Sequence, residues 1–495
     1  MAGKVLIANR GEIAVRIARA LRDMSLPSVA VYTDADRGAL HTRRTDEVVR
    51  LGADRSAYLD AERTVNAARS VGAWAIHPGY GFLSENPELA EACERAGIVF
   101  IGPPAAAIRA MGDKVRARNH MLDAGVPIVP GGPARDLEQA KQTAAQVGYP
   151  ILLKASAGGG GKGMRRVESE AELGPALERT QNEAGRSFGD ATVYVEKAID
   201  GARHVEIQVL GDRSGRLVHL FERDCSLQRR HQKIVEETPC PVLSEATRDA
   251  MCQVALAGAQ AIGYYSAGTF EFLLGRDQSF YFLEMNTRLQ VEHPITELVT
   301  GVDLVQEMVR IADGAPLSFA SVERRGVAIE ARVYAEDPAR GFMPAPGRIE
   351  QLSLASGPFV RDDSGIARGS EVSPEFDPLL SKLSTWAPTR AQALARLRRA
   401  LGECSVLGVH TNLDFLLQLL ASPRVVTGDY DTTFVENHMA ELLPPEQSEA
   451  DALREAVVLA ALAAEHDRGA ATAVAQSVPA SRWQQALAGR SRFGS

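Results

Sequence analysis

The stretch EMNTRLQVE, residues 284–292, alternates polar and apolar side chains. Successive side chains of an extended backbone point to opposite faces, so the polar ones would line one face about 7 Å apart. That face would carry Glu284, Asn286, Arg288, Gln290 and Glu292. We therefore expect a strand-like segment that presents carboxylates, amides and a guanidinium group together.

Residues 269–274 and 280–285, just upstream, are expected to form two strands joined by the turn-rich segment GRDQS. In an antiparallel hairpin with a loop of about four residues, Glu271 would lie opposite Glu284, with Cβ atoms about 5 Å apart. Two facing carboxylates repel each other unless a cation lies between them. With Asn286 they offer the oxygen ligands that Mg²⁺ prefers, so we expect a metal site here. The alternative is an accidental acidic pair on a solvated strand.

The composition is that of an ordinary soluble globular chain. Its 495 residues are enough for about three domains. A net charge of -8 argues against nucleic acid as a partner. Five scattered cysteines without a CxxC pair argue against zinc and favour reduced thiols. No signal segment precedes the first strand at 4–8 and no apolar run could cross a membrane, so we expect a cytoplasmic protein.

A glycine-rich segment, GGGGKGM at residues 158–164, follows a predicted strand that ends at Lys154. Consecutive glycines cost entropy to order, but they let backbone N–H groups approach phosphate oxygens closely. The spacing is not that of a Walker loop, because Gly163 follows Lys162. We expect a mobile lid over nucleotide phosphates, with a flexible linker as the alternative.

A second loop, PGYGFLSENP at residues 78–87, follows the predicted strand at 73–77. Parallel α/β sheets place ligands at such carboxyl ends of strands. Dinucleotide binding is disfavoured, because the turn after the first strand holds the single Gly11 and not GxGxxG. Tyr80 in this loop is a candidate for the substrate side, and the alternative is a capped turn packed on the next helix.

The longer run EMNTRLQVEHPITE, residues 284–297, is similar to the signature of biotin carboxylases, the ATP-grasp component of biotin-dependent carboxylases. The similarity extends from Lys4 to about Leu443. It implies a multidomain α/β and α+β fold: a Rossmann-like pre-ATP-grasp domain at 1–112, an ATP-grasp domain at 113–318 with a mobile glycine-rich lid at about 130–203, and a biotin carboxylase C-terminal domain at 326–440. Residues 441–495 would form a linker and the helical start of a following region, with Leu453, Val457 and Ala461 on one face.

The resemblance also implies an ATP site. Its members would be Lys114, Lys154, Gly158, Gly159, Gly160, Gly161, Met164, Glu196, Lys197, Ile199, His204, Gln228 and His231. This chain has Ala198 where the family commonly has an aromatic residue beside adenine. Without the resemblance, the polar run at 223–233 would suggest a solvated face and His204 a structural histidine.

The resemblance further implies a bicarbonate and biotin site. Lys233, Arg288, Gln290 and the Val291 backbone would bind bicarbonate, and Glu292 would be the base. Arg332 would stabilise the enolate oxygen of biotin, near Tyr80; the alternative for Arg332 is a solvent-facing strand arginine.

The implied function is Mg²⁺- (or Mn²⁺-) and ATP-dependent carboxylation of carrier-bound biotin with bicarbonate through carboxyphosphate. Residues 376–383 and 408–415 resemble acyl-CoA carboxylase α subunits, in which this is the first half-reaction. The partners would be a carboxyltransferase β subunit, a biotin carrier domain and a second copy of this chain or a larger complex. No methionine is followed by lysine, so the carrier is expected on a separate chain or in a longer α subunit. The alternatives are another ATP-grasp ligase and a catalytically silent ATP-binding scaffold; the acyl-CoA is not specified.

Overall fold

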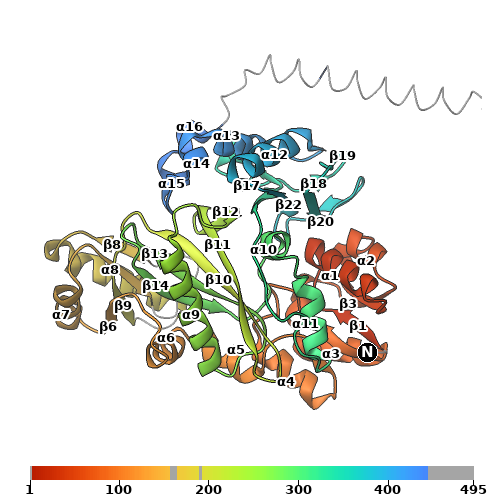
Figure 1. Cartoon of the computed structure of the whole chain (residues 1–495), viewed down its shortest axis with the longest axis horizontal. Coiled ribbons are helices and arrows are strands. Elements are labelled where there is room, and N and C mark those ends of the chain that lie inside the picture. The colour runs from red at the N-terminus through yellow and green to blue at the C-terminus, as the bar shows by residue number, and fades with distance from the viewer. Residues whose placement is uncertain (1–2, 156–163, 189–191, 444–456, 458–495) are drawn as a thin grey trace, which may run out of the picture. The chain divides into compact units, whose positions relative to one another are not determined.

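The computed structural model describes residues 3–155, 164–188, 192–443 and 457 (Figure 1). The chain divides into two compact units, Met1–Leu443 and Pro444–Ser495. The expected linker and helical region at 441–495 belongs almost wholly to the second unit, and all of it beyond Leu443 except Val457 lies outside the described residues. Among the described residues, no helix combines the length and the apolar character needed to cross a membrane.

The N-terminal part is a five-stranded parallel sheet with helices packed on it, which confirms the expected Rossmann-like α/β arrangement. The strand at 4–7 is buried, and Ile13, Ile17 and Leu21 of the first helix pack in the same core, as their spacing predicts. The strands, in the sheet order β3-β2-β1-β4-β5, and the helices are β1 Lys4–Ile7, β2 Ser28–Thr33, β3 Glu47–Gly52, β4 Ala73–His77, β5 Val99–Phe100, α1 Gly11–Asp23, η1 Asp34–Asp36, α2 Leu40–Arg44, η2 Arg55–Leu59, α3 Ala61–Ser70, α4 Pro87–Arg95, α5 Ala105–Gly112 and α6 Lys114–Asp123.

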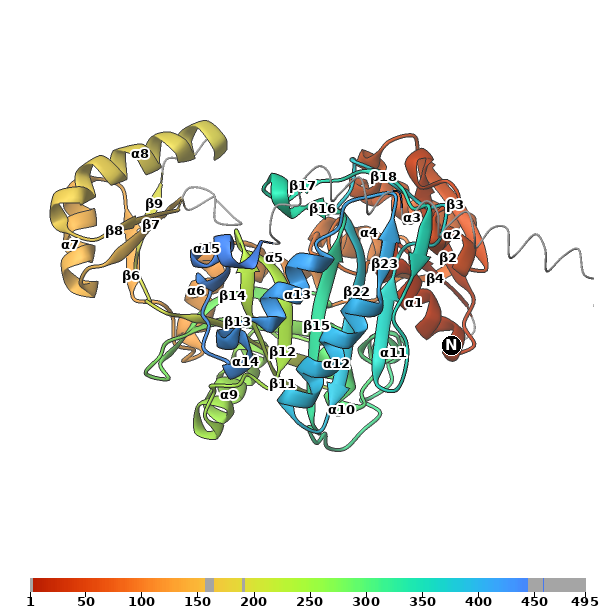
Figure 2. The ribbon, with the colours of Figure 1, turned by 90° about the horizontal axis from the view of Figure 1, so that it is seen from above.

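A separate lobe lies within the range expected for the lid. Two helices cover one face of its four-stranded antiparallel sheet and share a small core of their own (Figure 2). In sheet order β6-β9-β7-β8 its elements are β6 Gly131–Ala134, β9 Val193–Lys197, β7 Ile151–Ala155 and β8 Met164–Val167, with α7 Leu137–Val147 and α8 Glu170–Phe188. The glycines at 158–161 lie outside the described residues.

An eight-stranded antiparallel sheet carries most of the remaining chain. It crosses the boundary expected between the ATP-grasp and C-terminal domains, because a strand at 232–238 pairs with one at 327–334. In sheet order its strands are β14 Phe280–Asn286, β13 Ser266–Leu274, β10 Arg203–Gly211, β11 Leu217–Arg229, β12 Gln232–Thr238, β15 Val327–Tyr334, β22 Leu379–Ala387 and β20 Val360–Ser364.

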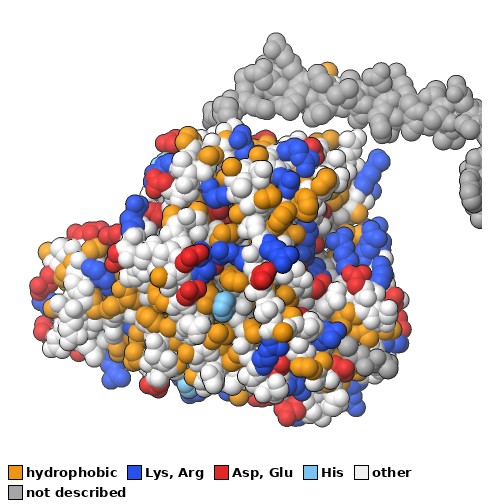
Figure 3. Space-filling model, viewed as in Figure 1, with side chains coloured by type: hydrophobic (Ala, Val, Ile, Leu, Met, Phe, Trp, Pro, Cys, Tyr) orange, Lys and Arg blue, Asp and Glu red, His pale blue; other side chains and the backbone are white. Residues whose placement is uncertain are grey.

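The other elements surround this sheet. They are α9 Glu245–Ala261, α10 His293–Thr300, α11 Leu304–Ala312, η3 Pro338–Arg340, α12 Arg390–Glu403, α13 Leu413–Ala421, α14 Pro423–Thr427, α15 Phe434–Asn437, α16 Met439–Leu442 and the short strands β16 Glu336–Asp337, β17 Met343–Pro344, β18 Gly347–Arg348, β19 Gln351–Ser353, β21 Glu371–Val372 and β23 Ser405–Leu407. Basic and acidic side chains are interspersed over the face in Figure 3.

The predicted hairpin is confirmed. Strands β13 and β14 pair with Glu271 opposite Glu284 and Thr269 opposite Asn286. The hairpin thus fixes two of the expected metal-binding carboxylates directly across from each other.

The predicted strand-like continuation to residue 292 is wrong. Strand β14 ends at Asn286, and the chain then turns until Glu292 caps α10 with φ −81° and ψ 10°. Two helices, α10 and α11, follow this turn, because Gly301 ends the first at φ 74° and Asp303 caps the second.

Candidate active site

One cavity of about 1240 Å³ gathers most of the predicted site residues. The N-terminal domain, the small lobe and the large sheet all contribute to its wall. Lining it are Tyr80, Lys154, Met164, Glu196, Ala198, Ile199, His204, Gln228, His231, Lys233, Glu271, Glu284, Asn286, Arg288, Gln290, Val291 and Arg332. A concave site in which polar groups converge from several elements is typical of substrate binding.

Among the predicted residues whose side chains the structure describes, Glu292 and Lys197 stand apart from this wall. Glu292 has no exposed surface and lies behind the wall. Lys197 donates to the carbonyls of Gly148 (3.0 Å) and Tyr149 (2.9 Å), so its ammonium group binds within the small lobe. The side chain of Lys114, in α6, lies outside what the structure describes.

Lys233, near the start of β12, is the centre of the charged network. Its Nζ donates to Glu206 (2.6 Å), Glu271 (2.9 Å) and Glu292 (2.7 Å). Burial alone would lower the pKa of Lys233, but Cys225 and these carboxylates outweigh it and hold the pKa well above its ordinary value. A permanent cation therefore stands between three carboxylates at the cavity wall.

Glu292 is held by two cations. Its Oε1 accepts from Lys233 and its Oε2 accepts from Arg332 Nη2 (3.0 Å). Burial would raise the pKa of Glu292, but Lys233, Arg332 and Arg223 outweigh it and keep the pKa well below its ordinary value. The side chain is a carboxylate at neutral pH, which is the form that a proton acceptor needs.

Glu271 lies where several side chains converge. His204 Nε2 approaches its Oε2 to 2.9 Å, and the amide nitrogens of Asn286 (2.9 Å) and Gln290 (3.1 Å) donate to its Oε1. Burial would raise the pKa of Glu271, but Lys233 and His204 outweigh it and hold the pKa well below its usual value. This carboxylate is therefore charged, as a metal ligand must be.

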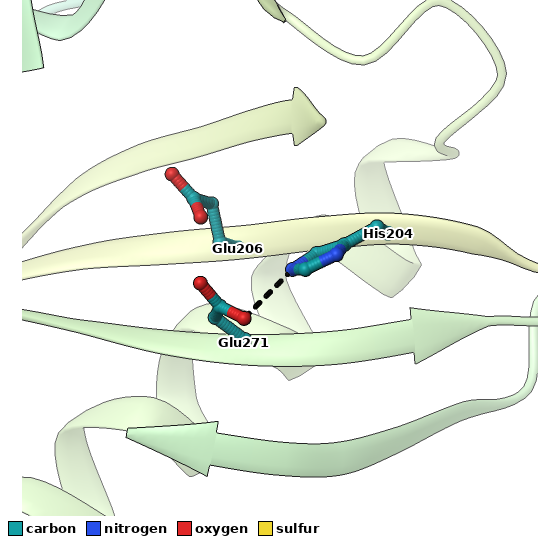
Figure 4. Close-up of side chains that lie close together, drawn as sticks. All are labelled: His204, Glu206 and Glu271. Atoms are coloured by element: carbon teal, nitrogen blue, oxygen red, sulfur yellow. Dashed lines mark ion pairs between the residues drawn. The ribbon is translucent and has the colours of Figure 1, made fainter. Parts of the chain in front are cut away.

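The hairpin carries the predicted oxygen donors for a divalent cation. Glu284 is exposed on the cavity wall, directly across the strand pair from Glu271. Their carboxylates are hard oxygen ligands of the kind that suit Mg²⁺. Among the described residues, one close group of potential ligands is His204, Glu206 and Glu271, shown in Figure 4. This group does not contain Glu284. Lys233 donates to both of its carboxylates, Glu206 and Glu271.

Arg288 is held at the cavity by three neighbours. Its Nη1 donates to Gln290 (3.0 Å), its Nη2 to Asn286 Oδ1 (2.8 Å) and its Nε to Glu85 (2.8 Å). Glu85 also accepts from the backbone of Thr287 (3.1 Å). The guanidinium group is thus fixed by the predicted loop at 78–87, although the sequence analysis did not single out Glu85.

Arg332 is buried, which excludes the solvent-facing alternative. Its Nε donates to Glu236 (2.6 Å) and its Nη2 to Glu292. The planar group is therefore held from two sides while it lines the cavity.

Tyr80 donates to the carboxylate of Glu12, so the predicted loop is tied to α1. Lys382 pairs with the same carboxylate at 3.1 Å and donates to the carbonyl of Val291 at 2.7 Å. The backbone at Val291 is thereby fixed from the C-terminal part of the sheet.

The small lobe builds the side of the cavity where the resemblance predicts the nucleotide. Lys154 Nζ pairs with Glu196 (2.5 Å), and Arg118 lies 3.5 Å from the same carboxylate. Ala198 is buried on the cavity wall, and its N–H donates to the carbonyl of Pro150 (3.0 Å). Arg118 was missed because nothing in its local sequence marks it.

Family models match the chain in three consecutive parts. They are the biotin carboxylase N-terminal domain at 1–108, the carbamoyl-phosphate synthase L chain ATP binding domain at 113–320 and the biotin carboxylase C-terminal domain at 330–437.

Two relatives illustrate the sequence similarity. The propionyl-CoA carboxylase alpha chain of Ruegeria pomeroyi is 47% identical over 467 residues, which cover 89% of this chain and 69% of that protein. Biotin carboxylase 2 of Bacillus subtilis is 49% identical over 442 residues, which cover 88% of this chain and 99% of that protein. The chain thus spans about two thirds of the acyl-CoA carboxylase alpha chains to which it is similar, with shares from 69% down to 64%.

Solved structures agree with these relatives. The biotin carboxylase domain of Hydrogenobacter thermophilus 2-oxoglutarate carboxylase, in complex with MgADP, ADP and bicarbonate, superposes with a TM-score of 0.85 at 44% identity over 90% of this chain and all of that one. The biotin carboxylase of Campylobacter jejuni, in an ATP-type complex, gives a TM-score of 0.84 at 42% identity over 88% of this chain and 99% of that one.

Proposed function

This chain belongs to the biotin carboxylase family, and from that premise we propose how its cavity carries out the reaction. The protein is an ATP-dependent ligase that uses bicarbonate to carboxylate biotin. One observation supports the assignment of roles: Lys233 donates to three carboxylates, one of which is Glu292. Arg288 and Arg332 line the same cavity as Lys233.

Glu292 acts as the base that takes the proton of bicarbonate. Bicarbonate becomes a useful nucleophile only when this proton leaves, and Glu292 is a deprotonated carboxylate that accepts from both Lys233 and Arg332. A proton on Glu292 removes the negative charge that Lys233 and Arg332 both contact, so the positive charge of these two groups then acts on the anion in the cavity.

Arg288 and Gln290 bind the bicarbonate anion. The guanidinium group offers parallel N–H donors that match a planar carboxylate-like anion, and Glu85 and Asn286 fix its plane. The Val291 backbone, which Lys382 holds, completes the bicarbonate site.

The small lobe and the hairpin hold the nucleotide. Lys154, His204, Gln228 and His231 bind ATP from the lobe and the large sheet, together with Lys114, Met164, the glycines at 158–161, Glu196, Ile199 and the backbone at Lys197. Glu271, Glu284 and Asn286 would hold Mg²⁺ or Mn²⁺, which neutralises charge on the phosphates when bound. These oxygen donors fit such an ion once Asn286 Oδ1 is released from Arg288.

Arg332 orients biotin beside Tyr80. The guanidinium group would donate to the ureido oxygen of biotin, while Glu236 and Glu292 keep it in place. Biotin supplies the nitrogen that accepts the carboxyl group.

The complete enzyme is an acyl-CoA carboxylase in this proposal. This chain would then work with a biotin carrier and a carboxyltransferase β subunit, and as a homodimer or a larger assembly. The alpha chains that it resembles support this, because they include propionyl-CoA and methylcrotonoyl-CoA carboxylases.

ADP formation tests the proposed function. With Mg²⁺, ATP and bicarbonate, we expect free biotin to stimulate ADP release, and we expect the stimulated rate to vanish when bicarbonate is omitted or when EDTA removes the metal. ADP release that is indifferent to biotin would contradict the assignment and leave a different ATP-grasp ligase.

A further inference from the structure

Two buried carboxyl groups face each other behind Arg332. Glu236 in β12 lies opposite Glu330 in β15, and neither side chain has exposed surface. Directly opposed residues of antiparallel strands point to the same face, with Cβ atoms about 5 Å apart. Such a pair of like groups is destabilising if both are charged.

Each carboxyl group has one partner and one bare oxygen. Glu236 Oε1 accepts from Arg332, and Glu330 Oε2 accepts from Ser384 Oγ (2.6 Å). Glu236 Oε2 and Glu330 Oε1 are buried and have no hydrogen-bond partner within the described residues. Buried polar atoms are nearly always hydrogen-bonded, so these two opposed acceptors need an explanation.

The cations that face the pair do not supply a donor to either of the two unpartnered oxygens. Arg332 in β15 already binds Glu236 and Glu292, and Lys382 in β22 already binds Glu12 and the Val291 carbonyl. Lys233 in β12 is the remaining cation that acts on Glu236, and it is shared by three other carboxylates.

The balance of these effects favours a proton on Glu330. Burial, followed by the charge of Glu236, raises the pKa of Glu330 to about 8, although Lys382 and Ser384 act in the opposite direction. Burial also raises the pKa of Glu236, to about 7, but Arg332 donates directly to this carboxylate and stabilises its charge.

We propose that Glu330 is a protonated positioning residue that donates from Oε1 to Oε2 of Glu236 and so holds Arg332 in place from behind. One proton satisfies both bare oxygens and leaves a single negative charge against Arg332. This inference rests on the proposed role of Arg332 toward biotin. Loss of the proton would set two carboxylates against each other, move Glu236 and disturb the Arg332 guanidinium group.

Glu330→Gln and Glu330→Leu separate the proton from the side-chain volume. The glutamine can donate to Glu236 at every pH, so it should support biotin-dependent ADP release at neutral pH. The leucine cannot donate, and we expect kcat/KM for biotin to fall about tenfold, the loss typical of a buried acceptor left without its donor. Equal impairment of the two variants would overturn the proposal.

The pH profile gives a readout that a merely structural role would not move. The wild-type to Glu330→Gln ratio of kcat/KM for biotin should decline as pH rises through about 8, because only the wild type loses its proton. The same ratio for biotin-independent, bicarbonate-dependent ATP hydrolysis should stay constant. A ratio for biotin that does not change with pH would overturn the proposal.

Infrared spectroscopy detects the proton without activity. The difference spectrum of wild type minus Glu330→Gln should show a protonated carboxylic acid band that disappears above pH of about 8. Absence of this band would mean that water bridges two carboxylates, and it would overturn the proposal. If the wild type instead shows no biotin-dependent ADP release, the proposed function fails. The infrared spectrum still shows whether Glu330 is protonated.

Discussion

Glu292→Gln is expected to lower kcat for biotin-dependent ADP release by about a thousandfold, within the range that a general base contributes. The amide keeps the shape of the side chain but cannot take the proton of bicarbonate. Lys233 keeps Glu206 and Glu271 as partners, and Arg332 keeps Glu236, so the network should survive the change. Steady-state kinetics at saturating bicarbonate measure the effect.

Glu350→Gln is the control for this substitution. It makes the same chemical change at an exposed position, where the nearest cation is Arg348 at 3.8 Å, and it should leave kcat unchanged. A Glu292→Gln enzyme with kcat within a few-fold of the wild type would exclude Glu292 as the base. A lowered thermal midpoint would instead point to a structural role.

Arg288→Ala is expected to abolish carboxylation while the fold stays intact. Loss of a preorganised donor to a reacting anion costs about a hundredfold or more in kcat. Arg288 lies at the cavity wall and its ion-pair partner Glu85 is partly exposed, so the freed carboxylate can be hydrated. Biotin-dependent ADP release, measured together with circular dichroism, separates the two effects.

Arg276→Ala provides the matched arginine control. Arg276 lies in the turn of the same hairpin, is mostly exposed and comes no closer than 3.7 Å to Asp431. Its replacement should leave turnover unchanged. Near-normal carboxylation by Arg288→Ala would contradict the anion-binding role.

The hairpin could be predicted from sequence because its information is local. Strand alternation and a turn-rich link predict the two strands, and a shift of register between Glu271 and Phe272 brings Glu271 opposite Glu284. The same reasoning failed after Asn286, because the polar alternation continues where the backbone does not. The contacts of Glu85 with Thr287 and Arg288 fix the turned segment there, and they come from about two hundred residues away.

The polar run at 223–233 shows the other limit of sequence patterns. By composition it resembles a solvated face, yet Arg223 has no exposed surface and binds Glu206, Gln208 and Thr296. The charges are buried because their partners come from neighbouring strands and from α10. Glu206, Glu236 and Lys382 were missed for the same reason: their partners lie on other elements, which periodicity does not reveal.

Label transfer from isotopically labelled bicarbonate to free biotin tests the central claim most directly. The wild-type protein with Mg²⁺ and ATP should place one label on biotin for each ADP formed in the biotin-stimulated reaction, and no label without ATP. ADP formation that biotin stimulates without any label in biotin would contradict the account.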